Sequence, residues 1–171
     1  MKPPLWQRLD AVARNLTPFG LTLVLVILSV VPLHLPDFQR VVPGLTLMAV
    51  YHWAIYRPNL LPASVVFLIG VLQDALMGLP MGVSALVFLT VYGVVLSQRR
   101  FFSGKSFAIV WFGFTLVAAG AAVESWLLVS AFNTAFLNPE AALYQYVVTV
   151  GVFPILAWGF LRWQRTFLRL E

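Results

Sequence analysis

Two acidic residues, Asp74 and Glu124, have the strongest potential for chemistry in this sequence, because each lies inside a long apolar stretch. Charged side chains within a bilayer are costly, and they usually face a helix-bundle interior or a water-filled cavity. At 1.5 Å per residue, Asp74 lies about 21 Å and Glu124 about 27 Å from the inner ends of their expected helices. Both acids are therefore expected toward the outer leaflet, in one shared polar site or on either side of an outward vestibule.

Small residues accompany both acids. Gly70, Asp74 and Gly78 are spaced by four, so they lie on one helix face, and Gly120 lies one turn before Glu124. Small residues allow helix backbones to approach closely. Each acid is therefore expected to point into a contact between helices.

The sequence offers several hydrogen-bond donors for these two acids, namely Ser84, Thr90 and neighbouring backbone groups, and Arg40 is a plausible cationic partner for Asp74. A catalytic pair or proton relay would need a reacting group between the acids. No such group can be inferred from the sequence. The alternative, in which both acids are structural hydrogen-bonding anchors or contacts for a partner helix, is therefore favoured.

Other motifs for catalysis or cofactor binding are missing from the sequence. His34 and His52 have no second histidine three or four residues away, so a zinc site is not expected. There is no G-x-S-x-G motif and no phosphate-binding glycine loop. With no cysteine, thiolate chemistry and disulfides are also excluded. No catalytic residue, metal or cofactor is expected.

The composition places the chain in a membrane. Of its 171 residues, 61% are hydrophobic and 10% are charged, whereas soluble domains have about 45–50% and about 25%. So few charges cannot cover a surface that faces water. At about 20 apolar residues per crossing, and with room for loops, the chain is long enough for about six crossings. A soluble enzyme, a secreted disulfide domain, a DNA-binding module and a disordered tail are excluded.

The apolar runs predict an all-α membrane protein with one transmembrane domain over residues 1–171. The six helices are expected at about 19–35, 41–56, 60–78, 82–97, 106–130 and 142–161. Residues 1–16 are expected to form a short interfacial helix on the cytoplasmic face, or a frayed leader. Thr17-Pro18 predicts the start of the first membrane helix. Pro154 predicts a kink, because proline frees the carbonyl four residues earlier.

The helix expected at 41–56 is short, since 16 residues reach only about 24 Å. It ends with Tyr51, Trp53 and Tyr56, aromatic residues that are typical of a membrane–water interface.

The basic residues predict the orientation. With the N-terminus in the cytoplasm, Arg40 alone of the 11 Lys and Arg residues falls in an outer segment, and the other ten fall in inner segments. Lys and Arg concentrate in cytoplasmic loops. Six crossings with both termini inside is therefore the expected topology.

The middle of the chain resembles the rod shape-determining protein MreD family. The resemblance rests on a proline-started helix, an aromatic exit, an x-Pro turn, G-x-x-x-D and a G-x-P-x-G turn. These are Pro43-Gly44-Leu45, Tyr51-His52-Trp53, Arg57-Pro58, Gly70-Val71-Leu72-Gln73-Asp74 and Gly78-Leu79-Pro80-Met81-Gly82.

The resemblance implies a non-enzymatic scaffold in the bacterial inner membrane that helps to maintain cell shape. Its implied partner is MreC, and through MreC the MreB filament, RodA and the class B transpeptidase that build lateral peptidoglycan. It also implies packing similar to the S components of energy-coupling-factor transporters. The residues expected in the structural core or the partner-binding surface are Arg57, Pro58, Gly70, Asp74, Gly78, Pro80, Gly82 and Glu124.

Two other functions remain open from the sequence. A substrate-binding S component of a transporter would need an outward polar pocket, which Asp74 and Glu124 could line. An intramembrane hydrolase would use the same two carboxylates as a catalytic pair.

Overall fold

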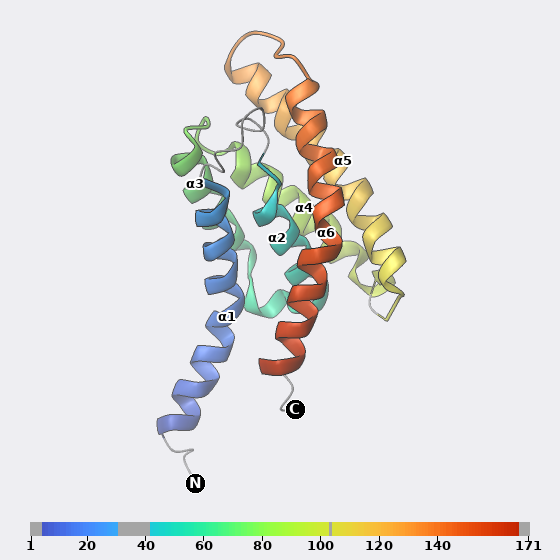
Figure 1. Ribbon diagram of the computed structural model, residues 1–171. Helices are drawn as coiled ribbons and strands as arrows, with labels where there is room; N and C mark the ends of the chain where they lie inside the picture. Colours follow the sequence, from blue (N-terminus) through green and yellow to red (C-terminus); the bar gives the residue numbers. More distant parts are fainter. Residues whose placement is uncertain (1–4, 31–41, 103, 168–171) are drawn as a thin grey trace.

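The computed structural model describes residues 5–30, 42–102 and 104–167, and this part of the chain is all-helical, as predicted (Figure 1). The helices are α1 (Leu5–Val30), α2 (Leu45–Tyr56), the 3-10 helix η1 (Pro58–Leu60), α3 (Ala63–Met77), α4 (Val83–Phe102), α5 (Phe107–Phe132) and α6 (Glu140–Phe167).

The first helix differs from the sequence prediction. Helix α1 is continuous from Leu5 to Val30, with Pro18 inside it. The helix start predicted at Thr17-Pro18 is therefore wrong, and no separate interfacial helix ends at residue 16. Proline removes one helical hydrogen bond and its ring crowds the carbonyl four residues earlier, and α1 continues through Pro18 despite this cost. The expected helix end near 35, His34 and Arg40 lie outside the described residues.

Helix α2 is the buried centre of the bundle and packs against α1, α4 and α6 (Figure 1). It begins at Leu45 rather than at 41, and every residue from Thr46 to Ile55 except the half-buried Leu47 is buried. Tyr51 and Trp53 are completely buried. The prediction that these two aromatic residues lie at the membrane interface is therefore wrong, because the bundle uses their large rings to fill its centre.

The aromatic core around Tyr51 joins four helices. Its ring meets Phe114 of α5 and Phe153 of α6 edge-on, with centroid distances of 5.1 and 5.8 Å, and Phe114 and Phe153 stack at 4.0 Å. The Tyr51 hydroxyl donates a hydrogen bond of 2.9 Å to the Val110 carbonyl. Phe102, near the end of α4, completes the cluster. Tight packing of this kind fixes where α5 and α6 lie relative to α2.

The remaining helices surround this centre. Helices α3 and α4 form a tight pair, and α5 packs against both α4 and α6. The start of α1 and the end of α6 lie at the same end of the bundle (Figure 1). The six described α-helices, an even number, account for that arrangement of the two ends.

Helix α6 runs without a break through Gly151 and Pro154, and it extends to Phe167 rather than to 161. Pro154 leaves the Val150 carbonyl, four residues earlier, without its helical donor. The indole N–H of Trp111 on α5 donates to that carbonyl at 3.2 Å. The carbonyl that the sequence analysis identified as free is thus satisfied by a neighbouring helix.

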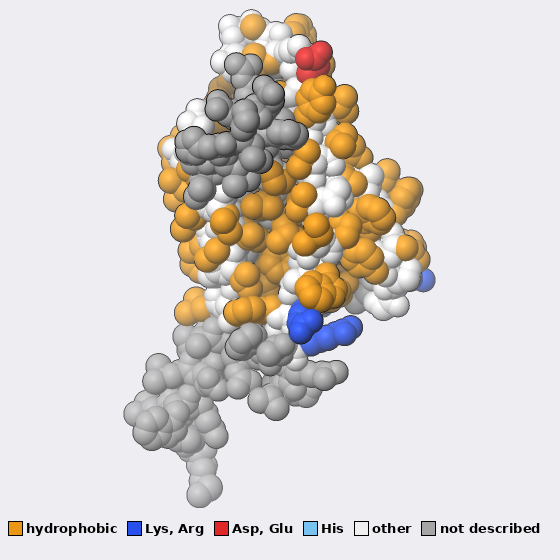
Figure 2. Space-filling view, viewed as in Figure 1, with side chains coloured by type: hydrophobic (Ala, Val, Ile, Leu, Met, Phe, Trp, Pro, Cys, Tyr) orange, Lys and Arg blue, Asp and Glu red, His pale blue; other side chains and the backbone are white. Residues whose placement is uncertain are grey.

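Three of the described helices are long and apolar enough to cross a bilayer. Helices α4, α5 and most of α6 (Glu140–Trp163) are long and apolar enough to cross a membrane, while Leu16–Val30, α2 and α3 are shorter apolar helices. Apolar side chains cover the visible face, and Lys and Arg gather at its lower end, where α6 ends (Figure 2).

Candidate functional site

Asp74 on α3 binds the first turn of α4. Its carboxylate accepts hydrogen bonds from the backbone N–H groups of Gly82 at 2.8 Å and of Ser84 at 3.0 and 3.1 Å. The Gly82 carbonyl accepts from the Leu86 N–H, so Gly82 is the residue that caps α4. The expected hydrogen bond from Ser84 is therefore present, and its donor is the backbone of that residue.

This arrangement explains how a carboxylate can be completely buried. The first N–H groups of a helix have no partner within the helix, and the helix dipole places partial positive charge there. Asp74 supplies the missing acceptors from a different helix. The N–H of Val83, between the two groups that Asp74 binds, donates instead to the Pro80 carbonyl at 3.3 Å.

The glycines of the turn make this contact possible. Gly78 ends α3 with φ +65° and its N–H donates to the Asp74 carbonyl, while Gly82 has φ +103°. Both conformations are in the left-handed region, where a side chain is strained. The segment from Gly78 to Gly82 therefore folds the chain back so that α4 begins beside the middle of α3.

Gly70 lies where the two helices approach most closely. A Cβ atom on Gly70 would lie 2.6 Å from the backbone nitrogen of Ala85 and also meet the Ala85 Cα. Gly70 and Asp74 are thus buried against α4, whereas Gly78, at the end of α3, is exposed. In the described structure the Gly70–Asp74 part of this face binds α4 rather than presenting an outer surface.

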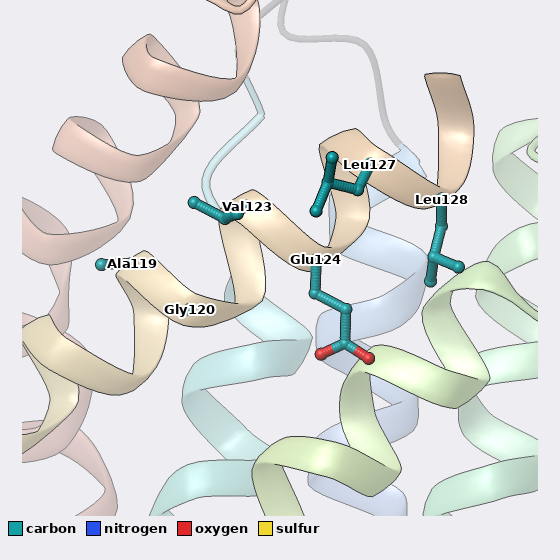
Figure 3. A pocket seen from close by; sticks show the side chains of 6 residues that line it. All are labelled: Ala119, Gly120, Val123, Glu124, Leu127 and Leu128. Carbon is teal, nitrogen blue, oxygen red and sulfur yellow. The ribbon is translucent and has the colours of Figure 1, made fainter. Parts of the chain in front are cut away.

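Glu124 on α5 lies in a different environment. It is half-buried, and its Oε1 accepts a hydrogen bond of 3.0 Å from the hydroxyl of Thr90 on α4, the donor expected from the sequence. Figure 3 shows its carboxylate pointing from α5 toward α4. An open apolar hollow surrounds it, lined by Ala119, Gly120, Val123, Glu124, Leu127 and Leu128 (Figure 3).

The two acids do not form a pair in the described structure. Asp74 binds Ser84 and Glu124 binds Thr90, six residues further along α4, which corresponds to about 9 Å along the helix axis. Each acid thus anchors its own helix to a different turn of α4. A shared polar site, one of the two arrangements expected from the sequence, would need Asp74 and Glu124 to meet, and in the described structure they do not.

Arg57 and Pro58 connect α2 to η1. The Arg57 N–H closes α2 on the Trp53 carbonyl at 2.9 Å, and the buried Pro58 offers its carbonyl to the Tyr92 hydroxyl at 3.3 Å. In addition, the Arg99 guanidinium of α4 donates from Nε to the Ile55 carbonyl at 3.0 Å. Helix α4 thus supplies a donor to one carbonyl at the end of α2 and another to η1.

Sequence reasoning did not identify Gly113 and Thr149 as packing residues. A Cβ atom on Gly113 would meet the Phe102 ring, and the Thr149 hydroxyl accepts a hydrogen bond of 2.9 Å from the Gly44 N–H. The signal at Gly113 was a glycine inside a helix, which often marks close packing. Thr149 gave no distinguishing signal.

Among the residues that the structure describes, no group of three His, Asp or Glu side chains could hold a metal ion.

The fold and these contacts define a class, that of helical membrane proteins in which acidic side chains on apolar helices join those helices to their neighbours. The rod shape-determining protein MreD family model matches residues 11–162, so the chain belongs to the MreD family of rod shape-determining membrane proteins. No curated protein and no solved structure matches the chain. The family is a structural, shape-determining one and is not known for catalysis.

Proposed function

We propose that this chain is a non-catalytic subunit of the bacterial cell-elongation complex, which binds MreC in the inner membrane and thereby supports lateral peptidoglycan synthesis. The observation that carries this proposal is the family match over residues 11–162. Through MreC, the chain would be connected to RodA, the class B transpeptidase and the MreB filament.

The structure supports a scaffold role because its polar side chains bind neighbouring helices. Asp74, Thr90 and Arg99 all bind other helices, and the turn from Gly78 to Gly82 is only five residues long. Little of the described chain extends beyond the helices, so binding to a partner would occur largely through helix surfaces. The proposal includes a topology in which the chain crosses the membrane six times and has both termini in the cytoplasm.

The first experiment tests the partner. The tagged chain is coexpressed with an MreC-type single-span protein, extracted in mild detergent and purified, and we expect the two proteins to copurify. Asp74→Leu should lose the complex, because the α3–α4 turn no longer holds the start of α4, whereas Glu140→Gln, at an exposed site, should keep it. A folded wild-type chain that never copurifies with MreC would contradict the proposal.

The second experiment tests the biological role. In a rod-shaped bacterium depleted of its own MreD, expression of this chain together with its MreC should restore rod shape. Failure to restore shape, combined with a rise in melting temperature on addition of a vitamin, would point instead to a transporter S component, because a tightly bound ligand stabilises the folded state.

A further inference from the structure

Basic residues with described side chains gather at one end of the bundle. They are Arg57, Arg99, Arg100, Lys105, Arg162 and Arg165, and together they define the basic end. The rings of His52 on α2 and Phe160 on α6, with centroids 4.9 Å apart, align the ends of these two helices. Figure 2 shows Lys and Arg side chains at the lower end of the visible face, where α6 ends.

The acidic side chains that the structure describes lie elsewhere. Asp74 binds the start of α4, and Glu124 binds Thr90, which is nine residues before Arg99 and thus about 13–14 Å away along the helix axis. Glu140 is the first residue of α6, at the far end of that helix from the basic end. No described carboxylate therefore balances the positive charge of the basic end, and a ligand that binds there is expected to be an anion.

Two of these cations, Arg57 and Arg99, are half-buried, whereas the other four are exposed. Helix α4 holds the chain on both sides of Arg57. Arg99 Nε donates to the Ile55 carbonyl at 3.0 Å, and the Tyr92 hydroxyl donates to the Pro58 carbonyl at 3.3 Å. Because Ile55 and Arg57 are two residues apart, a span of at most about 7 Å, both guanidinium groups are within reach of one small anion.

Both guanidinium groups retain hydrogen-bond donors. A guanidinium carries several N–H groups, and among the described residues Arg99 uses its Nε and the Arg57 side chain has no acceptor. Two neighbouring positive charges also repel each other. An anion between Arg57 and Arg99 would supply acceptors and remove this repulsion, and the planar fork of an arginine matches the oxygens of a phosphate group.

The surroundings of the basic end place it at a membrane surface. Lys105 Nζ lies 5.7 Å from the centre of the Phe101 ring, and the guanidinium carbon of Arg162 lies 5.2 Å from the Trp158 ring. Both rings are exposed. Exposed aromatic side chains beside cations are typical of the membrane–water interface. Phe101 follows Arg99 by two residues on α4, so the half-buried arginines lie at the depth of lipid headgroups.

We infer that Arg57 and Arg99 form a binding site for the phosphate group of an anionic phospholipid. Basic pockets between transmembrane helices bind headgroups of this kind. The four exposed cations around the pair favour a lipid with net negative charge over a zwitterionic lipid, whose amine they would repel. The inference goes beyond the proposed function and does not depend on MreC, because it requires only that the basic end lies at a membrane surface.

Native mass spectrometry of the purified chain in detergent measures lipid binding directly. The chain is titrated with phosphatidylglycerol and, separately, with phosphatidylcholine that has the same acyl chains. We expect the first phosphatidylglycerol to bind about tenfold more tightly than phosphatidylcholine. Inorganic phosphate should not displace it. Displacement by inorganic phosphate would identify a soluble anion as the ligand and overturn the lipid assignment.

Arg57→Gln tests the contribution of the half-buried pair. This change breaks no hydrogen bond of the described structure, so the lipid-free melting temperature should equal that of wild type. We expect the affinity for phosphatidylglycerol to fall about tenfold, and by at most about twofold in Arg165→Gln, the matched loss of one exposed charge at the basic end.

Arg57→Lys tests the hydrogen-bonding geometry separately from the charge. Lysine keeps the positive charge but lacks the planar fork, so its affinity should lie between those of wild type and Arg57→Gln. This variant also serves as the test if Arg57→Gln lowers the melting temperature of the lipid-free protein. Wild-type affinity in Arg57→Lys, together with a loss in Arg57→Gln equal to that in Arg165→Gln, would overturn the inference.

Other results would also overturn the lipid site. Equal affinity of the wild type for the two lipids would exclude selectivity for negative charge. Weaker copurification of Arg57→Gln with a partner protein, combined with unchanged lipid binding, would assign the pair to an acidic protein segment instead. The proposed function fails separately, because the lipid titration uses the purified chain alone. Failure of MreC to copurify would leave this lipid site standing.

Discussion

Asp74 shows how one residue can join two helices. A capping side chain usually lies at the start of the helix that it caps, whereas Asp74 caps α4 from the last turn of the preceding helix, α3. Its carboxylate is buried and fully engaged with backbone N–H groups, so its negative charge is balanced by the helix N-terminus. The residue therefore acts on the fold of the α3–α4 pair.

Replacement of Asp74 should destabilise the protein according to how many acceptors are lost. Asp74→Leu leaves buried N–H groups of Gly82 and Ser84 without a partner, which costs about 1–3 kcal/mol for each such group. Asp74→Asn keeps one oxygen acceptor and should fall between Leu and wild type. Thermal unfolding in detergent measures the order, with Glu140→Gln as the unaffected control. A melting temperature for Asp74→Leu equal to that of wild type would contradict the capping role.

Two glycines provide a second, matched test. Gly70→Ala forces a methyl group against the backbone of Ala85, so we expect a loss of about 1–3 kcal/mol from overpacking. Gly93→Ala on α4 meets nothing within 4 Å and should be neutral or stabilising by up to about 1 kcal/mol. Chemical denaturation of both variants measures the contrast. Equal effects would show that α3 and α4 are further apart than described.

At the scale of an element, α6 shows how a helix can contain a proline without breaking. The Val150 carbonyl loses its own helical donor to Pro154 and gains the indole N–H of Trp111. The bond also attaches α5 to α6. The carbonyl that Pro154 leaves free in α6 is thus used for a hydrogen bond between α5 and α6.

A double-mutant cycle can measure this compensation. Trp111→Phe should cost about 1 kcal/mol of unfolding free energy in the wild-type background, because the Val150 carbonyl loses its donor. In a Pro154→Ala background the helix restores an N–H at residue 154, so the same change should cost less. Unfolding free energies of the four proteins give the coupling. Additive effects would mean that the indole bond does not compensate for the proline.

At the scale of the whole molecule, the two ends of the bundle differ in the number of basic residues that they carry. The described Lys and Arg residues include Arg99, Arg100 and Lys105 around the α4–α5 turn and Arg162 and Arg165 near the end of α6. The α5–α6 connection instead contains Asn133 and Asn138, and α6 begins with Glu140. The positive end is expected to face the cytoplasm.

Cysteine labelling in intact cells tests this orientation. With a membrane-impermeant maleimide, Met81→Cys and Asn138→Cys should react before the inner membrane is permeabilised, and Ser106→Cys only afterwards. All three positions are exposed, so differences in labelling report the side of the membrane. Immediate labelling of Ser106→Cys would contradict a six-span topology with cytoplasmic ends.

The helices and the acid contacts could be predicted largely from the sequence, because they depend on local features. Long apolar runs mark the helices, and an acid within an apolar helix must find donors, as Glu124 does in Thr90. The place of each helix in the bundle could not be predicted. Aromatic residues such as Tyr51 and Trp53 are common both at membrane interfaces and in protein cores, so their type does not distinguish the two locations. Only the packing of α2 among its neighbours shows that these side chains are in the core. Likewise, Thr17-Pro18 is compatible with both a helix start and a helix interior.

The enclosed position of α2 has a consequence for the order in which the protein is made. At 12 residues it is about 18 Å long, well short of the roughly 30 Å hydrocarbon layer, and the helices around it supply its surroundings. Two of those neighbours, α4 and α6, are synthesised after it. We therefore expect α2 to remain at the translocation machinery or the membrane surface until later helices emerge, so that a nascent chain arrested before α4 would leave this segment accessible to protease.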